Sequence, residues 1–158
     1  MIMENETMLE QKVIVFQLKD EEFAVPVKQV GSIERLMKIT RVPQTADFVK
    51  GVVNLRGVVT PIIDLRVRFG IEATDYNEST RIIIVSLDDM EVGLIVDAAN
   101  DVIDIPVNVI EPAPEVVGAV DVDYIEGVAK LENRLLILLD LQKVLTTEEM
   151  KELKTVEG

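Results

Sequence analysis

The stretch GVVNLRGVVTPIIDL, from Gly51 to Leu65, recurs further along the chain as GVAKLENRLLILLDL, from Gly127 to Leu141. The opening glycine and valine, the central leucine and the closing aspartate–leucine pair fall at the same places in both. An aromatic and a β-branched residue precede each stretch, at positions 48–49 and 124–125. The matched residues all lie 76 positions apart, so the chain contains an internal repeat.

A second pair of matching segments extends the repeat toward the N-terminus. KVIVFQL, KDEE and FAVPV, from Lys12, predict two β-rich strands joined by a polar turn, and RIIIVSL, DDME and VGLIV repeat this pattern from Arg81. We therefore interpret the chain as a tandem duplication, with copies at about 12–70 and 81–145. Two small closed barrels are favoured over one continuous sandwich, because closing each sheet removes exposed strand edges.

Turn and cap chemistry accounts for several of the matched positions. Gly57 stands where Asn133 stands in the second copy, and both residue types accept positive φ readily, which predicts tight turns at Arg56-Gly57 and Glu132-Asn133. Asp64 and Asp140 each follow an apolar strand. Each is predicted to N-cap a short helical turn, a reading favoured over a pair of catalytic carboxylates because each aspartate recurs with its own repeat unit.

The two ends of the chain lie outside the repeat. Residues 1–11 are acidic and polar and are expected to be a flexible N-terminus without the features of a signal peptide. The segment 146–158 predicts a C-terminal helix, because Thr146 and Glu149 have capping-box spacing and Met150 and Leu153 share a face. This helix is expected to dock on a barrel, with partner binding as the bolder alternative.

Composition excludes several classes of function. The 158 residues contain no cysteine and no histidine, so neither a disulfide framework nor a Cys/His zinc site is possible. The formal net charge of −13 disfavours nucleic acid and anionic membranes as partners, and no apolar run is long enough to span a bilayer. This charge fits either a basic partner surface or plain solubility.

Motifs for chemistry are also missing from the sequence. It has no nucleotide-binding glycine loop, no G-x-S-x-G and no histidine to activate a serine, so we expect no enzyme activity, cofactor or metal. Arg56 remains unexplained, because it is a cation inside an apolar stretch and Glu132 replaces it in the second copy. It either braces its own barrel through a carboxylate or carbonyl groups or anchors an interface with a partner.

The residues around Arg56 also carry a resemblance. FVKGVVNLRGVVTPIIDLRVRF, from Phe48 to Phe69, resembles the signature of the CheW family of bacterial chemotaxis adaptors. The Tyr76-Asn77 linker, the segment 110–115 and the segment 134–145 resemble the family too, so the likeness covers about 12–150.

The resemblance implies a fold of two five-stranded SH3-like β-barrels with a hydrophobic core between them, in one domain at 12–145. It implies a non-enzymatic, cytoplasmic adaptor, held at membrane receptor arrays by its partners. These partners would be the cytoplasmic tips of chemoreceptors and the regulatory domain of the histidine kinase CheA. Direct membrane insertion is not implied.

Four positions are implied as partner-binding residues: Arg56 and Gly57 in the turn, Gly51 at the start of the motif, and Val30 after the second strand. The family often has an acidic residue where this chain has Ser32, whereas Glu34 lies two residues later. A CheV-type protein would carry a receiver domain after this one, and the end of the chain at Gly158 favours the adaptor. A detached kinase regulatory domain and a small enzyme are the weaker alternatives.

Overall fold

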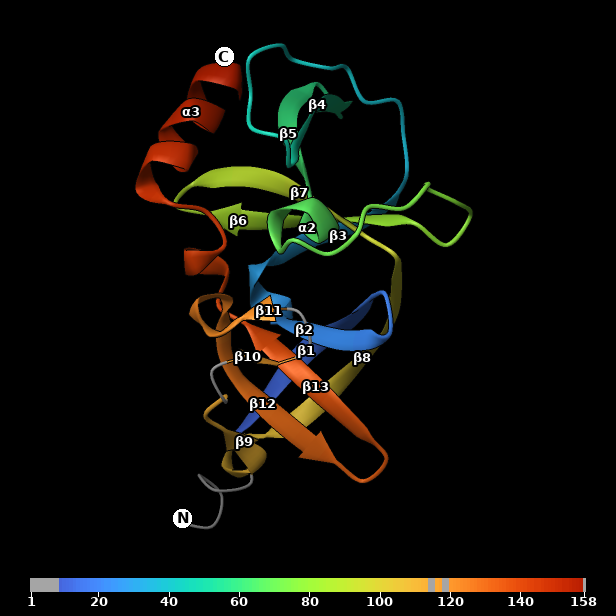
Figure 1. Ribbon diagram of the computed structural model, residues 1–158, viewed down its shortest axis with the longest axis vertical. Helices are drawn as coiled ribbons and strands as arrows, with labels where there is room; N and C mark the ends of the chain where they lie inside the picture. The colour runs from blue at the N-terminus through green and yellow to red at the C-terminus, as the bar shows by residue number, and fades with distance from the viewer. Residues whose placement is uncertain (1–8, 114–115, 118–119, 158) are drawn as a thin grey trace.

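The computed structural model describes residues 9–113, 116–117 and 120–157. Two curled β-sheets are stacked along the long axis, with a C-terminal helix against the upper sheet (Figure 1). The predicted mostly-β fold with two barrels and a C-terminal helix is confirmed. Within the described residues, no helix has the length and apolar character needed to cross a membrane.

The first sheet forms what we call the five-stranded barrel. In spatial order it contains β3 (Val30–Arg35), β6 (Arg81–Leu87), β7 (Met90–Val96), β5 (Val58–Asp64) and β4 (Val49–Leu55). The second sheet forms the six-stranded barrel, which contains β8 (Ala98–Pro106), β1 (Glu10–Leu18), β2 (Glu21–Pro26), β13 (Arg134–Leu139), β12 (Ile125–Leu131) and β9 (Ile110–Glu111). The extra strand, β9, is two residues long, and a single bridge between Thr40 and Val52 takes its place in the other barrel.

Short elements lie outside the two large sheets. They are α2 (Leu65–Arg68), α3 (Thr147–Glu157), the 3-10 turns η1 (Val27–Gln29), η2 (Val107–Val109), η3 (Val122–Tyr124) and η4 (Leu141–Lys143), and the small hairpin of β10 (Val116–Val117) and β11 (Val120–Asp121). Because β1 begins at Glu10, the last residues of the segment expected to be flexible belong to a strand. Residues 1–8, and residues 114–115 of the family-like segment 110–115, lie outside the described residues.

The subdomain boundaries expected from the repeat, 12–70 and 81–145, are wrong as boundaries of the barrels. The hairpin β1–β2 of the first copy joins the six-stranded barrel, and the hairpin β6–β7 of the second copy joins the five-stranded barrel. The exchange is reciprocal, because β13 pairs in parallel with β2 just as β5 pairs with β7. A repeat in the sequence shows which strands are equivalent but not which strands pair with each other. Two parallel strands must be joined by a long connection, and the exchange of hairpins provides long connections between β2 and β13 and between β5 and β7.

The equivalence of the two copies themselves is confirmed in detail. β4 has a register shift between Val49 and Gly51, and β12 has one between Ile125 and Gly127. In the parallel ladders, Ile62 is opposite Gly93 and Leu138 is opposite Ala24, which are equivalent pairs in the repeat. The matched glycines therefore occupy the same kind of element at the same irregularity.

Hydrophobic side chains form three cores. Each barrel has its own small interior, around Val15 in the six-stranded barrel and Ile82 in the five-stranded barrel. The largest cluster lies between the barrels and includes Phe16, Phe23 and Ile83. Strands β1 and β6 contribute alternate residues to a barrel interior and to this shared core, which explains why their sequences are apolar on both faces.

Asp64 and Asp140 are N-caps, as predicted. Asp64 accepts backbone N–H groups from Arg66 at 2.9 Å and Val67 at 3.4 Å, and Asp140 accepts one from Gln142 at 3.1 Å. Asp64 has a further partner, because the Tyr76 hydroxyl donates to its other oxygen at 2.8 Å. Burial of the phenol, together with the hydrogen bond to the Asp64 carboxylate and its charge, raises the pKa of Tyr76.

The C-terminal helix docks as expected and is tied down by one arginine. The capping box is reciprocal, with Thr146 N–H to Glu149 at 2.8 Å and Glu149 N–H to the Thr146 hydroxyl at 3.1 Å. Met150 and Leu153 are buried. Arg68 of α2 holds both Glu149 oxygens, at 3.1 and 2.9 Å, which anchors α3 to the five-stranded barrel.

Alanine substitutions at the two caps should destabilise the protein unequally. Asp64→Ala is expected to lower the free energy of unfolding by about 2–3 kcal/mol, because it leaves two partly buried backbone donors and the Tyr76 hydroxyl without their acceptor. Asp140→Ala is expected to cost about 1 kcal/mol, the usual value of a partly exposed cap. Urea denaturation of both variants measures the difference, and equal losses would contradict the buried role of Asp64.

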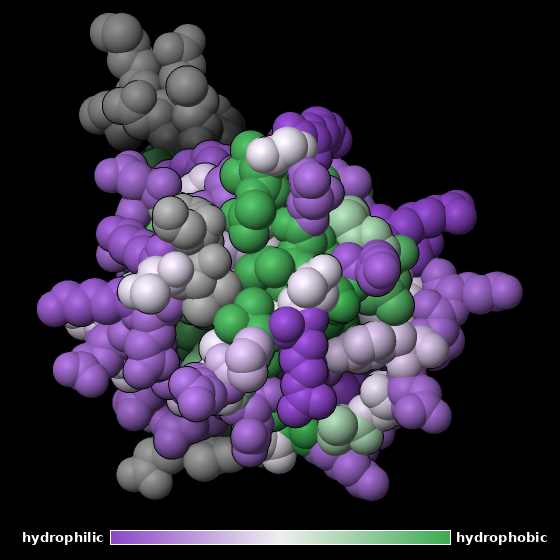
Figure 2. All heavy atoms as spheres, turned by 90° about the horizontal axis from the view of Figure 1, so that it is seen from above, coloured by the Kyte–Doolittle hydropathy of each residue, from purple (hydrophilic) through white to green (hydrophobic). Residues whose placement is uncertain are grey.

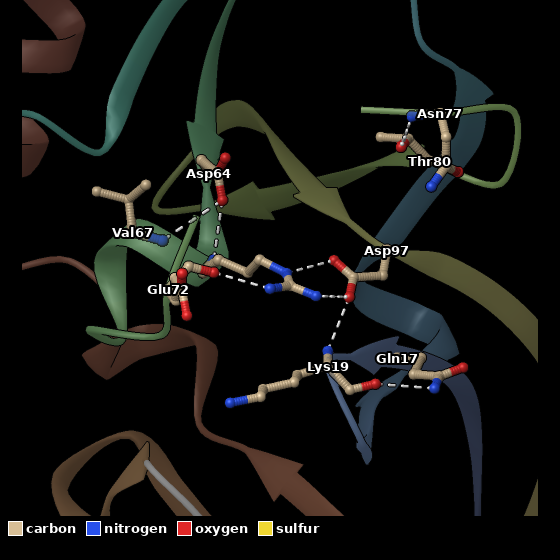
Figure 3. A network of polar contacts seen from close by, with 9 residues as sticks. Gln17, Lys19, Asp64, Val67, Glu72, Asn77, Thr80 and Asp97 are labelled. Atoms are coloured by element: carbon tan, nitrogen blue, oxygen red, sulfur yellow. Dashed lines mark hydrogen bonds and ion pairs between the residues drawn. The ribbon is translucent and has the colours of Figure 1, made fainter. Parts of the chain in front are cut away.

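An ionic network joins the barrels at Asp97, the residue between β7 and β8 (Figure 3). Burial raises the pKa of Asp97, but the hydrogen bonds from Arg66 and from the Lys19 N–H, together with the charge of Arg66, lower it more, so the pKa of Asp97 lies below its usual value. A carboxylate whose pKa is lower in the folded state than in the unfolded state stabilises the protein. This contribution is fully present when the pH is above the unfolded-state pKa. That contribution is lost as the pH falls through the folded value.

The stability difference between the wild type and Asp97→Asn should therefore depend on pH. It is expected to be constant from neutral pH down to about pH 5 and to shrink as the pH falls below the unfolded pKa of about 3.9, because only the wild type takes up a proton at this site. Urea midpoints at a series of pH values measure the difference, and Asp20→Asn in the exposed turn between β1 and β2 serves as the control. A difference that grows toward low pH would contradict this assignment.

Candidate protein-binding surface

The turn between β4 and β5 has an unusual residue at its tip. Arg56 and Gly57 have φ values of 53° and 87°, which are both left-handed, and the Gly57 N–H donates to the Asn54 side chain at 2.7 Å. Two-residue turns of this kind favour asparagine–glycine, because most side chains pay a steric cost at positive φ. The predicted tight turn is confirmed, and an arginine occupies a position where it adds strain to the backbone.

Arg56 has an acidic neighbour but is held loosely. Its Nη2 lies 3.4 Å from Oε2 of Glu34 on β3, and the Arg56 side chain is 74% exposed. An exposed pair at this distance contributes little to stability. The bracing interpretation therefore has a partner in Glu34, but the contact leaves the guanidinium free to meet another surface.

Apolar side chains lie exposed on the same barrel. Val58 and Val59 at the start of β5 are 49% and 40% exposed, and Ile33 on β3 is 41% exposed. Figure 2 shows the molecule from the end that carries β4 and β5, where hydrophobic side chains form a continuous area surrounded by polar ones. An exposed apolar area with a polar rim is typical of a protein-binding surface.

The other two predicted site residues are placed differently. Gly51 is buried in β4, and a Cβ at this position would overlap the carbonyl oxygen of Thr40, whose backbone pairs with Val52. Val30, at the start of β3, is half-buried and packs against the core between the barrels. The structure thus places Arg56 and Gly57 at the surface, whereas Gly51 is buried and Val30 is half-buried.

The equivalent turn in the second copy has diverged. Glu132 and Asn133 form a turn, but neither has a positive φ, so the predicted turn is confirmed and the predicted reason for asparagine is wrong. Arg134 follows this turn and is tied to both oxygens of Glu22, at 3.0 and 2.7 Å. The arginine of the second copy is a brace within its barrel, unlike Arg56.

Sequence reasoning missed one contributor to this surface. Glu34 was noted only as an acid displaced from the Ser32 position, whereas its Oε2 lies 3.4 Å from Arg56 Nη2. Ile33 and Leu36, in the same segment, are exposed as well. The alternation in the segment SIERLM was the available signal, because it places Ile33 and Glu34 on opposite faces of β3, and Glu34 is the one that pairs with Arg56.

The chemistry of this surface suits association rather than catalysis. It combines one loosely held cation with aliphatic side chains, and arginine and apolar residues are what a protein partner contacts in an interface centre. In the part of the chain that the structure describes, no group of three acidic side chains is arranged to hold a metal ion. The two-barrel body with this surface defines a protein-binding module.

Comparisons with known proteins agree with this class. A family model described as CheW-like domain matches residues 12–149. The chain is 50% identical over 139 residues to the chemotaxis protein CheW of Bacillus subtilis, covering 87% of this chain and 88% of the relative, and 40% identical over 140 residues to CheW of Klebsiella aerogenes, covering 89% and 84%. The chain belongs to the CheW-like domain family.

A solved structure supports the same assignment for the fold. The scaffolding protein TtCheW from Thermoanaerobacter tengcongensis superimposes with a TM-score of 0.81 at 37% identity, covering 88% of this chain and 90% of the other. At this TM-score and coverage, the two chains share the same overall fold.

Alanine at the two glycines of the site should separate the buried position from the exposed one. Gly57→Ala is expected to cost about 1 kcal/mol, because φ is positive but no atom lies near the new methyl group. Gly51→Ala is expected to cost more than about 2 kcal/mol, since the new methyl group meets the backbone of Thr40. Thermal and urea denaturation give both values. A fully stable Gly51→Ala that loses partner binding would instead make Gly51 a direct contact residue.

Proposed function

We propose that the chain is a non-enzymatic chemotaxis adaptor that couples chemoreceptors to the histidine kinase CheA. The observation that carries the proposal is the match to CheW proteins over both barrels, at up to 50% identity. The relatives are named as chemotaxis proteins, and the solved relative is named as a scaffolding protein. A scaffold needs at least two binding faces, and two related barrels supply two related faces.

The partners under this proposal are the cytoplasmic tips of chemoreceptors and the regulatory domain of CheA. The surface around Arg56 and Gly57 is proposed to contact a partner directly. Gly51 and Val30 are proposed to act from beneath, by fixing the shape of β4 and β3. The proposal places the protein in the cytoplasm, where its partners hold it at receptor arrays.

The role of Arg56 follows from its exposure and its weak pairing. If a partner buries an arginine, replacing that arginine with an acid leaves the opposing group of the partner unpaired. Such a change costs on the order of 2–5 kcal/mol of binding free energy. An arginine that only braces its barrel would lose folding stability instead. Arg56 is 74% exposed and 3.4 Å from Glu34, which supports the first role.

Two substitutions at Arg56 test this assignment. Arg56→Asn keeps a residue suited to the left-handed turn, and Arg56→Glu reverses the charge. Both are expected to change the free energy of unfolding by less than about 0.5 kcal/mol. Receptor-dependent stimulation of CheA should fall at least about tenfold in Arg56→Glu and less in Arg56→Asn. Reconstituted arrays of receptor fragment, adaptor and kinase give the activity, and denaturation gives the stability.

Lys12→Glu provides a matched control on the other barrel. Lys12 is also largely exposed, at 61%, and lies 3.9 Å from an acid, Asp104. It carries the same charge reversal outside the proposed surface, so kinase stimulation should stay near the wild-type level. Normal stimulation by Arg56→Glu would remove Arg56 from the interface. A loss that only follows a lowered unfolding midpoint would assign it to bracing.

A further inference from the structure

The two barrels meet at two joints that the internal repeat makes equivalent. At one joint the turn between β1 and β2 lies beside α2, and at the other Asp88, in the turn between β6 and β7, lies beside η4. Arg66 of α2 occupies the place that Gln142 occupies in η4. The joints therefore share a backbone framework and differ in charge.

Arg66 forms the ionic contact of the first joint. Its Nε donates to Oδ1 of Asp97 at 2.8 Å, its Nη2 donates to Oδ2 at 2.5 Å, and its Nη1 donates to the carbonyl of Glu72 at 2.7 Å. The Arg66 side chain is 14% exposed. A bidentate arginine–carboxylate pair fixes direction as well as distance.

Asp97 carries this contact from one barrel to the other. It is the single residue between β7 and β8, where the chain passes from the five-stranded to the six-stranded barrel. Its Oδ2 also accepts the N–H of Lys19 at 2.7 Å (Figure 3). The Asp97 N–H donates to the Gln17 carbonyl at 3.0 Å. One carboxylate therefore connects α2, the crossover and the β1–β2 turn.

The second joint is built without such a pair. Asp88 and Gln142 line a cavity of about 180 Å³, together with Leu87, Leu141 and residues of α3. The position equivalent to Asp97 in the repeat is Lys28, an exposed residue of η1. Within the described residues, the first joint thus has a bidentate ion pair and the second has none. A separate bond, from Arg68 Nε of α2 to the Val144 carbonyl at 2.7 Å, ties α2 to the segment that follows η4.

We infer that Arg66 is a positioning residue for the coupling function: through Asp97 it sets the angle between the barrels and hence the relative placement of their partner-binding faces. This inference rests on the proposed adaptor function. Each face lies within its own barrel, so each partner can still bind alone when the pair is broken. What is lost is the geometry in which both partners are held at once.

The relative orientation of the two barrels can be measured with spin labels. The chain contains no cysteine, so labels attach only at the cysteines that are introduced. Ser86→Cys on β6 and Glu126→Cys on β12 place one spin label on each barrel at exposed positions. In the full-length protein, Arg66→Gln introduces the residue found at the equivalent place in the second copy. The distance distribution between the labels is expected to shift or broaden by at least about 2 Å, the size of typical interface displacements.

Two further variants test whether the change in label distance is specific to the Arg66–Asp97 pair. Asp97→Asn keeps an oxygen for the Lys19 N–H but loses the charge, and it should reproduce the change. Arg134→Gln breaks a similar bidentate pair, with Glu22, that lies within the six-stranded barrel, and it should leave the distance distribution as in the wild type. Folding of all variants is checked by their unfolding midpoints.

Binding and coupling are then measured on the same samples, with a receptor cytoplasmic fragment and the CheA regulatory domain as probes. In Arg66→Gln, the two separate dissociation constants should stay within about twofold of the wild type, while receptor-dependent kinase stimulation falls at least about tenfold. An unchanged label distance in Arg66→Gln, or the same change in Arg134→Gln, overturns the inference. If the wild type binds neither probe, the proposed function fails, whereas the label distances still decide the positioning role.

Discussion

The structure depends on the hydrophobic core that lies between the two barrels. Strands β1 and β6 present apolar side chains on both faces, so neither barrel alone could cover them. Aromatic rings run through this core in sequence, with ring centroids 5.7 Å apart for Phe16 and Phe23, 6.3 Å for Phe23 and Phe69, and 5.0 Å for Phe69 and Tyr124. These rings come from both copies of the repeat. The exchange of hairpins and the shared core are therefore one feature, because each barrel completes its sheet and buries its outer face with strands from both copies.

Local sequence rules predicted the parts of this fold that depend on neighbouring residues. The N-cap at Asp64, the capping box at Thr146 and the turn at Arg56 all follow from short-range hydrogen bonds or backbone sterics. The exchange could not be predicted in the same way, because a period of two residues identifies the faces of a strand but not its neighbour. The Arg66–Asp97 contact joins residues 31 positions apart and depends on that exchange, so it could not be predicted from the sequence either.

In the candidate surface, too, the residue marked by its local sequence could be predicted, whereas its neighbours from distant segments could not. A motif and a lone cation marked Arg56, whereas its neighbour Glu34 and the exposed Ile33 became visible only when β3 was placed beside the hairpin. The two copies keep the framework and vary the residues on it. Arg134 is held by two bonds to Glu22, while Arg56 is left exposed at a strained turn. Duplication thus supplied one scaffold with two surfaces that were free to diverge.

The exchange also sets the order in which the barrels can close during synthesis. The five-stranded barrel has all its strands once Val96 has been made, because β3 to β7 are contiguous in the chain. The hairpin β1–β2 is made first, yet its partner β13 ends at Leu139. The six-stranded barrel therefore cannot enclose this hairpin until β13 has been made, and a strand that lacks its partner is prone to aggregate in the meantime.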